Sequence, residues 1–576
     1  MISVALGTVA LALLTLQTAA SQAPLQVPSS ESADYTFKWP IRKVAVIGAG
    51  VSGMISYREF LKAGFDVHVF ERDHLPGGNW YYTDEVPDKA PIPNAECTIG
   101  DYIPSLPPKG VKFPYEQIYH GHEAKEVARS HRAPKPVWKS MTAGPAPDIQ
   151  IDDFPWPAGT PWELSNAQIS GYLRAFASYN GANSNDNNPR LSYNTRVELV
   201  EKHFDEEGKE AGWTLTLKTV TRTDVNSSKA VWTKQEFDAI VVATGRFNAP
   251  NIPNIPGLVE WDKAFPNRVM HSRQYRHPES FTNQTVLVVG AASSGDQISR
   301  ELDTHAKKIF TSIRADNSTV AHGTLKFLLR PLPPSIEVVG EVKRFLPPTS
   351  TIGTSSIELA NGTSLTGVDA IIFATGFRYS FPFLPQYHNP SVPNDQTGPS
   401  NLPQPIVTDG THLRNLYLDI FYIEEPTIGF VNMNIGPQPF AYSEYVAVAL
   451  SKVWSNKAKI PSVSELWQWN TKQREERQGF GRHYLYMGVD QTDKMYRYFT
   501  AWLNDAAAKY GGRQVNGQGP VRDQTLRMWL RARYGDSNVA ISSLPNTCMN
   551  SFDEGAMTMQ CGESKVDIRD LAFSEA

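Results

Sequence analysis

The stretch Lys43–Gly53, KVAVIGAGVSG, predicts the opening of a dinucleotide-binding fold. KVAVI is an apolar run of strand length that suits a buried parallel strand, and helical spacing of apolar side chains follows the glycines. Gly48 allows a tight turn, Gly50 lets the backbone approach a pyrophosphate, and Gly53 lets the helix pack on the strand. The next strand, DVHVFE, ends at Glu71, whose carboxylate can accept the hydroxyl groups of a ribose.

A second glycine turn follows in RDHLPGGNWYY. Gly78 and the glycine before it let the backbone run close beside a cofactor. Asn79 and Trp80 complete the turn, and the tryptophan can form an aromatic wall. A plain nicotinamide site does not need such a turn, whereas an extended flavin does. The first loop is therefore predicted to hold FAD, with ordinary core packing as the alternative for Trp80.

The same strand, turn and helix pattern returns in VLVVGAASSGDQ, which begins at Val286. Gly290 is predicted to be the turn glycine and Gly295 the helix-packing glycine. Ala292 replaces the middle glycine, so the backbone is expected to stand slightly farther from a phosphate there. This loop predicts a second dinucleotide site.

The second loop carries groups suited to NADPH. Ser293 and Ser294 can donate hydroxyl hydrogen bonds to a phosphate. The following strand, KIFTSIR, ends in Arg314 rather than in an acid. An arginine suits a 2′-phosphate through bidentate pairing, whereas a carboxylate suits a free ribose hydroxyl. A surface arginine without this role is the alternative.

Two further segments, FDAIVVATGR at 237–246 and VDAIIFATGF at 368–377, resemble each other. Each is predicted to be a buried strand that ends in Ala-Thr-Gly and marks a crossing of the chain between two domains. The predicted cofactor contacts in these turns are Thr244, Gly245, Thr375 and Gly376. The expected fold class is therefore α/β, with two Rossmann-like dinucleotide-binding domains and the NADPH domain inserted in a discontinuous FAD domain.

The expected boundaries follow from these segments. They are a signal peptide (1–20), a linker (21–39), the first stretch of the FAD-binding domain (40–250), the NADPH-binding domain (251–367), the returning stretch of the FAD-binding domain with a helical C-terminal region (368–545), and a loose tail (546–576). SEYVAVALSKVW, within 368–545, is predicted to be an amphipathic helix. Further helices are expected in GVDQTDKMYRYFTAWLNDAAAKYGG and DQTLRMWLRARYG.

Composition narrows the function classes. The chain has 576 residues, 41% hydrophobic and 20% charged residues, and a formal net charge of −4. No long basic run is present, so nucleic acid is not an expected partner. No Ser/His/Asp arrangement and no metal-ligand spacing is found, so no metal site is expected. The oligomeric state cannot be derived.

The N-terminal run MISVALGTVALALLTLQTAA is typical of a secretory signal peptide, although it has no basic residues before the apolar run. An uncleaved anchor and a disordered leader are the alternatives, and no stable membrane span is expected. The secretory pathway is therefore the expected location, either outside the cell or in a vesicle or endoplasmic reticulum lumen. Cys548 and Cys561 can pair there or remain free thiols. Four Asn-x-Ser/Thr sequons agree weakly with this location: Asn226, Asn283, Asn317 and Asn361.

Taken together, these motifs resemble those of the flavin-containing monooxygenases, over about residues 42–460. The matching stretches are GAGVSG, GGNW, DFPWP, ATGRFNAPNIPNIPG, VGAASSG and FATGF. The identifying stretch of the family stands here as FPNRVMHSRQY, with Phe265, His271 and Tyr275 in place. His271 has two interpretations: a structural hydrogen-bonded residue, or a contact with the cofactor or the domain interface.

Three departures from the family pattern bear on function. Asn267 replaces a glycine, which suggests a locally altered turn. Tyr275 stands where the Baeyer–Villiger branch usually has tryptophan, which favours oxygenation of a heteroatom. Ala143 stands where the family has an asparagine beside the flavin, so protection of the oxygenated flavin and substrate positioning fall to another residue or are lost. No catalytic residue is assigned.

The resemblance implies an NADPH- and O2-dependent FAD monooxygenase that acts through a flavin hydroperoxide on a nucleophilic nitrogen or sulfur of a small molecule. A role in specialised metabolism is a further hypothesis. Baeyer–Villiger oxygenation of ketones is one alternative. An uncoupled NADPH oxidase or non-oxygenating flavoprotein is another, and Ala143 favours it. A disulfide oxidoreductase would need a cysteine pair beside the flavin, and only Cys97 lies in that half of the chain.

Overall fold

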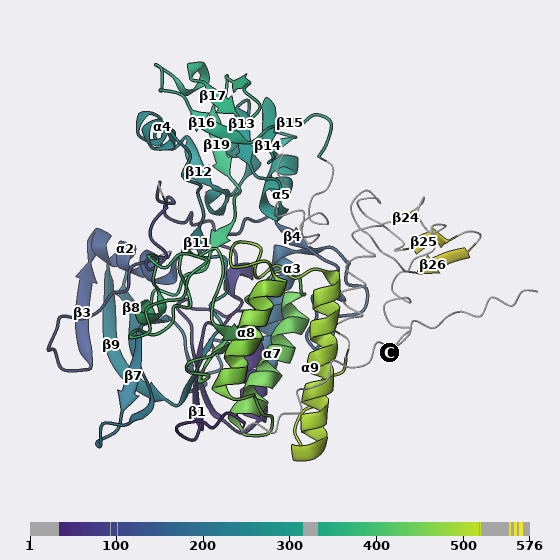
Figure 1. The fold of residues 1–576 in the computed structure, drawn as a ribbon. Coiled ribbons are helices and arrows are strands. Elements are labelled where there is room, and N and C mark those ends of the chain that lie inside the picture. Colours follow the sequence, from purple (N-terminus) through teal and green to yellow (C-terminus); the bar gives the residue numbers. More distant parts are fainter. Residues whose placement is uncertain are drawn as a thin grey trace, which may run out of the picture.

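The computed structural model describes most of the chain as two lobes, the larger one below the smaller in Figure 1. The described residues are 34–314 except 93 and 101, 332–517, 519, and the strand residues 552–553, 558–561 and 564–567. No described helix is long and apolar enough to cross a membrane.

The larger lobe is built on a seven-stranded sheet in the order β21-β22-β23-β10-β1-β2-β6. Its parallel strands are β1 (Lys43–Ile47), β2 (Asp66–Phe70), β6 (Leu191–Ser192), β10 (Ala239–Val242) and β23 (Ile428–Phe430). Two short antiparallel strands, β21 (Leu416–Tyr417) and β22 (Phe421–Tyr422), extend one edge. Near-continuous runs of Val and Ile form β1 and β10, as expected for strands buried on both faces.

Two helices pack against each other beside this sheet: α1 (Val51–Lys62) and α7 (Pro439–Trp454). Every residue of α7 from Phe440 to Trp454 is buried. The expectation of an amphipathic helix here is therefore wrong, because α7 lies inside the lobe with neighbours all round.

The smaller lobe contains a second sheet in the order β12-β19-β13-β14-β15, with all neighbours parallel. Its strands are β12 (Val269–His271), β13 (Thr285–Val289), β14 (Lys308–Ser312), β15 (Glu337–Val339) and β19 (Ala370–Phe373). Helix α5 (Ser293–Leu302) follows β13. The α/β class with two Rossmann-like units is confirmed. Strand β19 pairs with β13, so the second unit extends past the boundary expected at residue 367.

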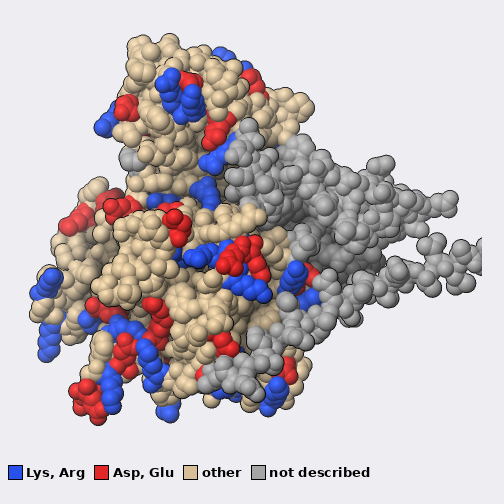
Figure 2. Space-filling model, viewed as in Figure 1, with Lys and Arg blue, Asp and Glu red and all other residues tan. Residues whose placement is uncertain are grey.

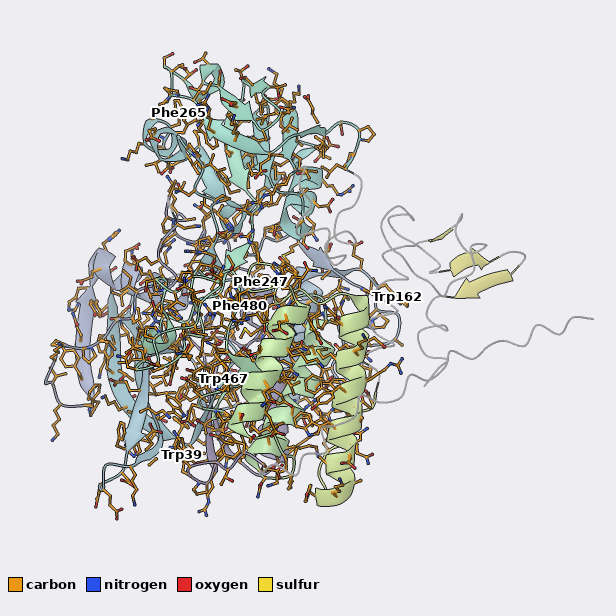
Figure 3. The ribbon with its side chains drawn as sticks, in the orientation of Figure 1. Trp39, Trp162, Phe247, Phe265, Trp467 and Phe480 are labelled. Atoms are coloured by element: carbon orange, nitrogen blue, oxygen red, sulfur yellow. The ribbon has the colours of Figure 1, made fainter. Side chains whose placement is uncertain are left out.

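The chain crosses between the lobes at β11 (Ala249–Pro250) and β20 (Phe377–Arg378), which pair with each other antiparallel. β10 and β19, the strands that precede these crossings, belong to different sheets. Figure 1 shows β11 between the lobes, and Figure 3 shows Phe247 close to this crossing and Phe265 in the smaller lobe. The two Ala-Thr-Gly turns therefore mark the crossings of the chain.

A four-stranded antiparallel sheet flanks the larger lobe, in the order β3-β9-β8-β7. Its strands and the helix α2 beside it are β3 (Tyr115–His120), β7 (Thr195–Phe204), β8 (Glu210–Asp224), β9 (Ser227–Phe237) and α2 (Gly121–Arg132). The smaller lobe also has α4 (Leu258–Ala264) and the strands β16 (Val342–Phe345), β17 (Ile357–Leu359) and β18 (Ser364–Leu365). Near the crossing lie α3 (Asn166–Tyr179) and the hairpin of β4 (Thr142–Ala143) and β5 (Leu164–Ser165).

The chain ends depart from expectation. Within the expected linker, Tyr35 N donates to the Ile460 carbonyl at 3.0 Å and Trp39 is buried, so residues 34–39 pack on the larger lobe. The C-terminal helices are α8 (Val463–Glu476) and α9 (Val489–Tyr510). In place of a wholly loose tail, β24 (Phe552–Asp553), β25 (Thr558–Cys561) and β26 (Ser564–Asp567) form a small antiparallel sheet. The signal peptide, the DQTLRMWLRARYG helix, Asn317 and Cys548 lie outside the described residues.

Candidate active site between two nucleotide loops

The first nucleotide loop connects β1 to α1 at the carboxyl end of the parallel strands. Gly48 has φ +105°, and a Cβ there would lie 2.7 Å from the carbonyl oxygen of Ala243. A Cβ on Gly53 would lie 1.8 Å from the carbonyl oxygen of Gly48. Gly50 is the N-cap of α1 and provides no side-chain cap, which leaves first-turn N–H groups available to a phosphate. This cradle fits a dinucleotide pyrophosphate and excludes side chains.

The second loop repeats this geometry in the smaller lobe. Gly290 has φ +103°, and a Cβ there would lie 2.7 Å from the carbonyl oxygen of Ala374. A Cβ on Gly295 would lie 2.0 Å from the carbonyl oxygen of Gly290. Ala292, the N-cap of α5, has φ −75° and ψ −170°, against −72° and −171° at Gly50. The middle position needs no left-handed backbone, so the alanine keeps the conformation of a glycine.

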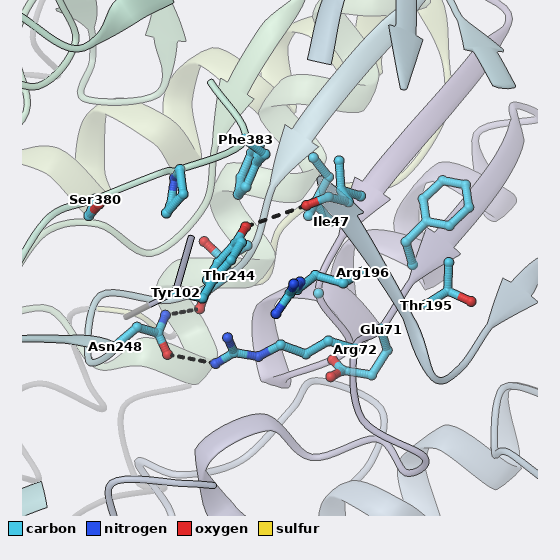
Figure 4. A pocket seen from close by; sticks show the side chains of 14 residues that line it. Ile47, Glu71, Arg72, Tyr102, Thr195, Arg196, Thr244, Asn248, Ser380 and Phe383 are labelled. Atoms are coloured by element: carbon cyan, nitrogen blue, oxygen red, sulfur yellow. Dashed lines mark hydrogen bonds between the residues drawn. The ribbon is translucent and has the colours of Figure 1, made fainter. Parts of the chain in front are cut away.

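Glu71 lies beside the first loop, at the carboxyl end of β2. Its Oε2 accepts from Ala49 N at 2.7 Å and its Oε1 from Asp73 N at 2.8 Å. It faces a cavity lined by Ile47, Gly48, Phe70, Glu71, Arg72, Tyr102, Thr195, Arg196, Val197, Thr244, Asn248, Ser380, Pro382 and Phe383. Figure 4 shows the cavity, with Asn248 bridging Arg72 at 3.3 Å and the Thr244 carbonyl at 3.0 Å. Glu71 provides a carboxylate for a ribose, and the arginine and aromatic side chains of the lining provide surfaces for a purine. This combination fits the adenosine end of FAD.

The Gly-Gly turn packs directly on the first loop. Gly78 has φ +57°, and a Cβ on it would lie 2.9 Å from the Cα of Gly50. Asn79 and Trp80 follow in the short 3-10 helix η1 (Gly78–Trp80), and both are half-buried. Trp80 packs against the core of the larger lobe, which is compatible with both predicted roles: an aromatic wall beside the flavin and ordinary core packing.

The predicted phosphate contacts of the second loop are exposed to different degrees. Ser293 is exposed and Ser294 is half-buried, and both lie in the first turn of α5. Arg314 follows β14, with its side chain 54% exposed and its Nε 3.3 Å from Glu341 Oε1. A 2′-phosphate would have to compete with Glu341, so the role of Arg314 stays a prediction. Figure 2 shows Lys and Arg side chains at the narrowing between the lobes, where an anionic cofactor would lie.

The two Ala-Thr-Gly turns share a backbone conformation, with φ +72° at Gly245 and +78° at Gly376. Thr244 lines the adenosine cavity, as described above. The Thr375 carbonyl accepts from Asn251 Nδ2 at 3.2 Å, and the Gly376 carbonyl accepts from Asn251 N at 2.9 Å. These bonds fix the second turn to the crossing strand. Each turn lies beside a nucleotide loop at the carboxyl ends of the parallel strands, the first beside Gly48 and the second beside Gly290.

His271 also holds the second turn. Its Nε2 donates to the Gly376 carbonyl at 2.9 Å, and its Nδ1 accepts from Arg273 N at 3.1 Å, which assigns the tautomer. The side chain is 0% exposed, and burial lowers its pKa to about 3. His271 is therefore a neutral histidine with both ring nitrogens bonded within the protein.

Two other positions of the identifying stretch also have structural explanations. Asn267 has φ +64°, and asparagine is among the few residues that tolerate this left-handed conformation. The asparagine therefore occupies a backbone conformation that favours glycine, and the altered turn stays a prediction. Tyr275 is 1% exposed, and its hydroxyl donates to Glu301 Oε2 at 2.9 Å. Trp138 Nε1 donates to the other oxygen of Glu301 at 2.7 Å. Burial and the Glu301 charge raise the pKa of Tyr275 well above its usual range.

Ala143 lies where the lobes meet. It pairs with Leu164 in the β4–β5 hairpin and packs against the core of the larger lobe. Its neighbour Thr142 accepts a hydrogen bond through its carbonyl from Gln297 Nε2 of α5 at 3.1 Å. The helix of the second loop therefore holds the strand that carries Ala143.

Sequence reasoning missed two residues at this junction. Glu301 joins α5 to Trp138 and Tyr275, and no local pattern identifies a carboxylate with such distant partners. Arg246 follows the first Ala-Thr-Gly turn, donates to the Asn432 carbonyl at 2.9 Å, and leaves Nε buried without a partner. Within the described chain no carboxylate pairs with it, and burial lowers its pKa. Its place in ATGR was the signal that could have identified it.

Comparison with known proteins agrees with this geometry. The family model described as flavin-binding monooxygenase-like matches residues 125–324, and the NAD(P)-binding Rossmann-like domain matches residues 46–98. The flavin-containing monooxygenase iboF of Amanita muscaria is 58% identical over 496 residues, which cover 84% of this chain and 92% of that protein. The thiol-specific monooxygenase of Saccharomyces cerevisiae is 26% identical over 433 residues, covering 73% and 78%.

A solved structure shares the fold. The S-allyl-L-cysteine S-oxygenase from Allium sativum superposes with a TM-score of 0.58 at 21% identity, covering 87% of this chain and 95% of that one. With the identity to iboF over most of both chains, the two glycine cradles and the paired crossings, the assignment follows: this chain belongs to the flavin-containing monooxygenase family and uses FAD and NADPH.

Proposed function

We propose that this enzyme oxygenates a nucleophilic nitrogen or sulfur atom of a small molecule, with NADPH and O2 as co-substrates. The observation that supports this proposal is that the polar atoms of His271 and Tyr275 all form hydrogen bonds within the protein. A ketone carbonyl that takes on negative charge needs a hydrogen-bond donor aimed at it. An amine or thioether brings its own lone pair and needs no such donor from His271 or Tyr275.

When bound, FAD supplies the redox chemistry between NADPH and O2. In this proposal the loops at Gly48 and Gly290 bind the two pyrophosphates and orient the cofactors. His271 holds the Gly376 turn that supports the NADPH side. The buried contacts of Glu301 with Trp138 and Tyr275 hold the segment around Trp138 on the core of the smaller lobe.

The test uses purified enzyme loaded with FAD. Amines, thioethers, thiols and ketones are supplied one at a time with NADPH, and NADPH consumption, oxygenated product and hydrogen peroxide are measured together. We expect product to account for most NADPH with one class of nitrogen or sulfur compound and not with ketones. Lactone or ester formation from ketones at a comparable rate would refute the proposal in favour of Baeyer–Villiger chemistry.

A second candidate, an uncoupled NADPH oxidase, is favoured by Ala143, which offers no polar side chain at the junction. In that case hydrogen peroxide would equal the NADPH consumed with every compound tested. The yeast relative is named a thiol-specific monooxygenase and the Allium structure an S-oxygenase, and these names support starting the panel with sulfur compounds.

We also propose that the enzyme works in the secretory pathway. Asn226, Asn283 and Asn361 are all exposed, so these three sequons are accessible to glycosylation. Expression with the native leader, followed by enzymatic removal of N-linked glycans, should increase electrophoretic mobility. Unchanged mobility together with an intact leader would contradict this location.

A further inference from the structure

Arg482 is a half-buried arginine of the larger lobe whose side chain has no hydrogen-bond acceptor and no carboxylate partner among the described residues. None of its side-chain nitrogens is enclosed by the protein, so they remain open to a ligand. Burial lowers the pKa of Arg482, and the positive charges of Arg314 and Arg378 lower it further. An anion beside such a guanidinium group stabilises its charge.

The contacts of the neighbouring segment place Arg482 beside the crossing between the lobes. The Phe480 ring stacks on the His412 ring, with the two centroids 5.0 Å apart. Two residues before this histidine, the Gly410 carbonyl accepts from Tyr379 N at 2.7 Å, directly after the crossing strand β20. Residues 410–412 therefore join the Phe480 segment to the crossing. Figure 3 shows Phe480 near the top of the larger lobe, below this crossing.

Arg314 belongs to the smaller lobe and lies at the edge of the second nucleotide loop. Gly290 N donates to the Ser312 carbonyl at 3.0 Å, so the end of β14 lies directly beside the turn of the loop. Arg314 follows two residues later, where an arginine suits the 2′-phosphate of NADPH. Its Nε lies 3.3 Å from Glu341 Oε1, so a phosphate must compete for it. Arg482 has no such competitor among the described residues.

Positive charge is in excess around Arg482. Arg314 and Arg378 both act on it as positive charges. Arg378 hydrogen-bonds a main-chain carbonyl and a thiol, which leaves its charge uncompensated. The carboxylate whose charge acts on Arg482 is that of Asp409, and its Oδ1 already accepts from Thr411 N at 2.9 Å and from the Thr411 hydroxyl at 2.7 Å. An anion between the lobes would balance this charge.

We propose that Arg482 of the larger lobe binds the 2′-phosphate of NADPH together with Arg314 of the smaller lobe. A guanidinium group pairs with a phosphate through two parallel hydrogen bonds, and two such groups suit a doubly charged anion. Since the two arginines come from different lobes, NADPH bridges the lobes through its phosphate and NADH cannot. The inference goes beyond the proposed function, because it concerns the choice of nicotinamide cofactor and not the atom that is oxygenated.

The experiment titrates NADP+ and, separately, NAD+ into FAD-loaded protein under anaerobic conditions and follows the flavin difference spectrum. The two ligands differ only in the 2′-phosphate. Arg482→Met should raise the Kd for NADP+ by about 10- to 100-fold, because a hydrogen bond between charged groups is lost. The Kd for NAD+ should change by less than about twofold. Rates of flavin reduction by NADPH and by NADH, each below its Kd, give the same comparison.

Arg474 provides the matched control. It is also half-buried, lies in α8, and its guanidinium group lies 5.7 Å from the centroid of the Phe480 ring. Arg474→Met removes the same charge from the same lobe, and both Kd values should stay within about twofold of wild type. Arg482→Lys keeps the charge but loses the bidentate pairing, so it should weaken NADP+ less than Arg482→Met does. This variant keeps the test valid if Arg482→Met loads FAD poorly.

Two results would overturn the inference. One is a Kd for NADP+ in Arg482→Met that stays within twofold of wild type. The other is an equal rise in the Kd for NADP+ and for NAD+, which would mean that Arg482 supports the junction without contacting the phosphate. Neither measurement needs a substrate to be oxygenated, so the inference can fail while the proposed nitrogen or sulfur oxygenation stands, and the reverse.

Discussion

Gly295→Ala should separate the two nucleotide sites. A Cβ at this position would lie 2.0 Å from the Gly290 carbonyl oxygen and 3.2 Å from the Cβ of Ala374. Carbon–oxygen contacts of this kind settle near 3.3 Å, so the helix and the turn must part by roughly 1.3 Å. Both sides of the contact are backbone, and neither can rotate away. The phosphate cradle of the second loop must therefore open.

The expected magnitude follows from this displacement. A misplacement of about 1 Å costs up to about 100-fold in a positioned site, and overpacking costs about 1–3 kcal/mol. We expect the Kd for NADP+ to rise by about 10–100-fold, or about 1.4–2.8 kcal/mol. FAD content should stay at wild-type level, because the first loop lies in the other lobe.

The assay is anaerobic titration of NADP+ into FAD-loaded protein, followed by the flavin difference spectrum. Ala292→Gly is the matched control, since its backbone angles already equal those of Gly50, and its Kd should change by less than about twofold. Gly53→Ala is the mirror variant: its Cβ would lie 1.8 Å from the Gly48 carbonyl oxygen, and it should purify with little FAD. A folded Gly295→Ala protein that binds NADP+ within twofold of wild type would refute the reasoning.

Three further predictions concern buried polar contacts. Arg513→Met should destabilise the protein by about 1.5–3 kcal/mol in urea unfolding, because Glu59 and Glu444 each lose one of two arginine partners while Arg58 stays; a loss below about 0.5 kcal/mol would contradict this. Glu301→Ala should lower the free energy of unfolding by about 2 kcal/mol or more, since two buried donors are left unpaired; unchanged stability would exclude its bridging role. The pKa of His271 is about 3 in the folded protein, below its value in the unfolded chain. Between about pH 6.5 and pH 3 the unfolded chain therefore binds a proton at His271 that the folded protein does not. The stability that His271 contributes is lost as the pH falls through this window, by up to about 1.4 kcal/mol per pH unit. His271→Gln should flatten the pH dependence of stability there, and an identical slope in both proteins would disprove it.

Local patterns predicted the two loops well because their function is local. The strand, the turn glycine and the helix-packing glycine occupy consecutive positions, and Gly48, Gly53, Gly290 and Gly295 all have the close contacts that their spacing predicted. The periodicity of apolar residues predicted the helix α7 but not its burial. Its helical period was correct, but burial on all sides depends on neighbours from distant regions of the chain.

The domain boundary and the conformation of residues that depart from the family pattern depended on contacts with distant parts of the chain. Strand β19 resembles β10 in sequence, and only pairing with β13 places it in the smaller lobe. At Asn267 the sequence did not reveal the backbone conformation, which has φ +64°. Residues 21–39 were expected to form a linker, yet Trp39 is buried.

By itself the sequence determined that this chain has two dinucleotide loops, which cofactors they suit, and that the chain crosses twice between two α/β units. These features are encoded in runs of a few residues, where strand propensity and glycine conformations suffice. Only the tertiary structure decided what surrounds Ala143 and which partners satisfy Tyr275 and His271. Such contacts join residues far apart in the chain, and their energies come from burial and hydrogen bonding that exist only after folding.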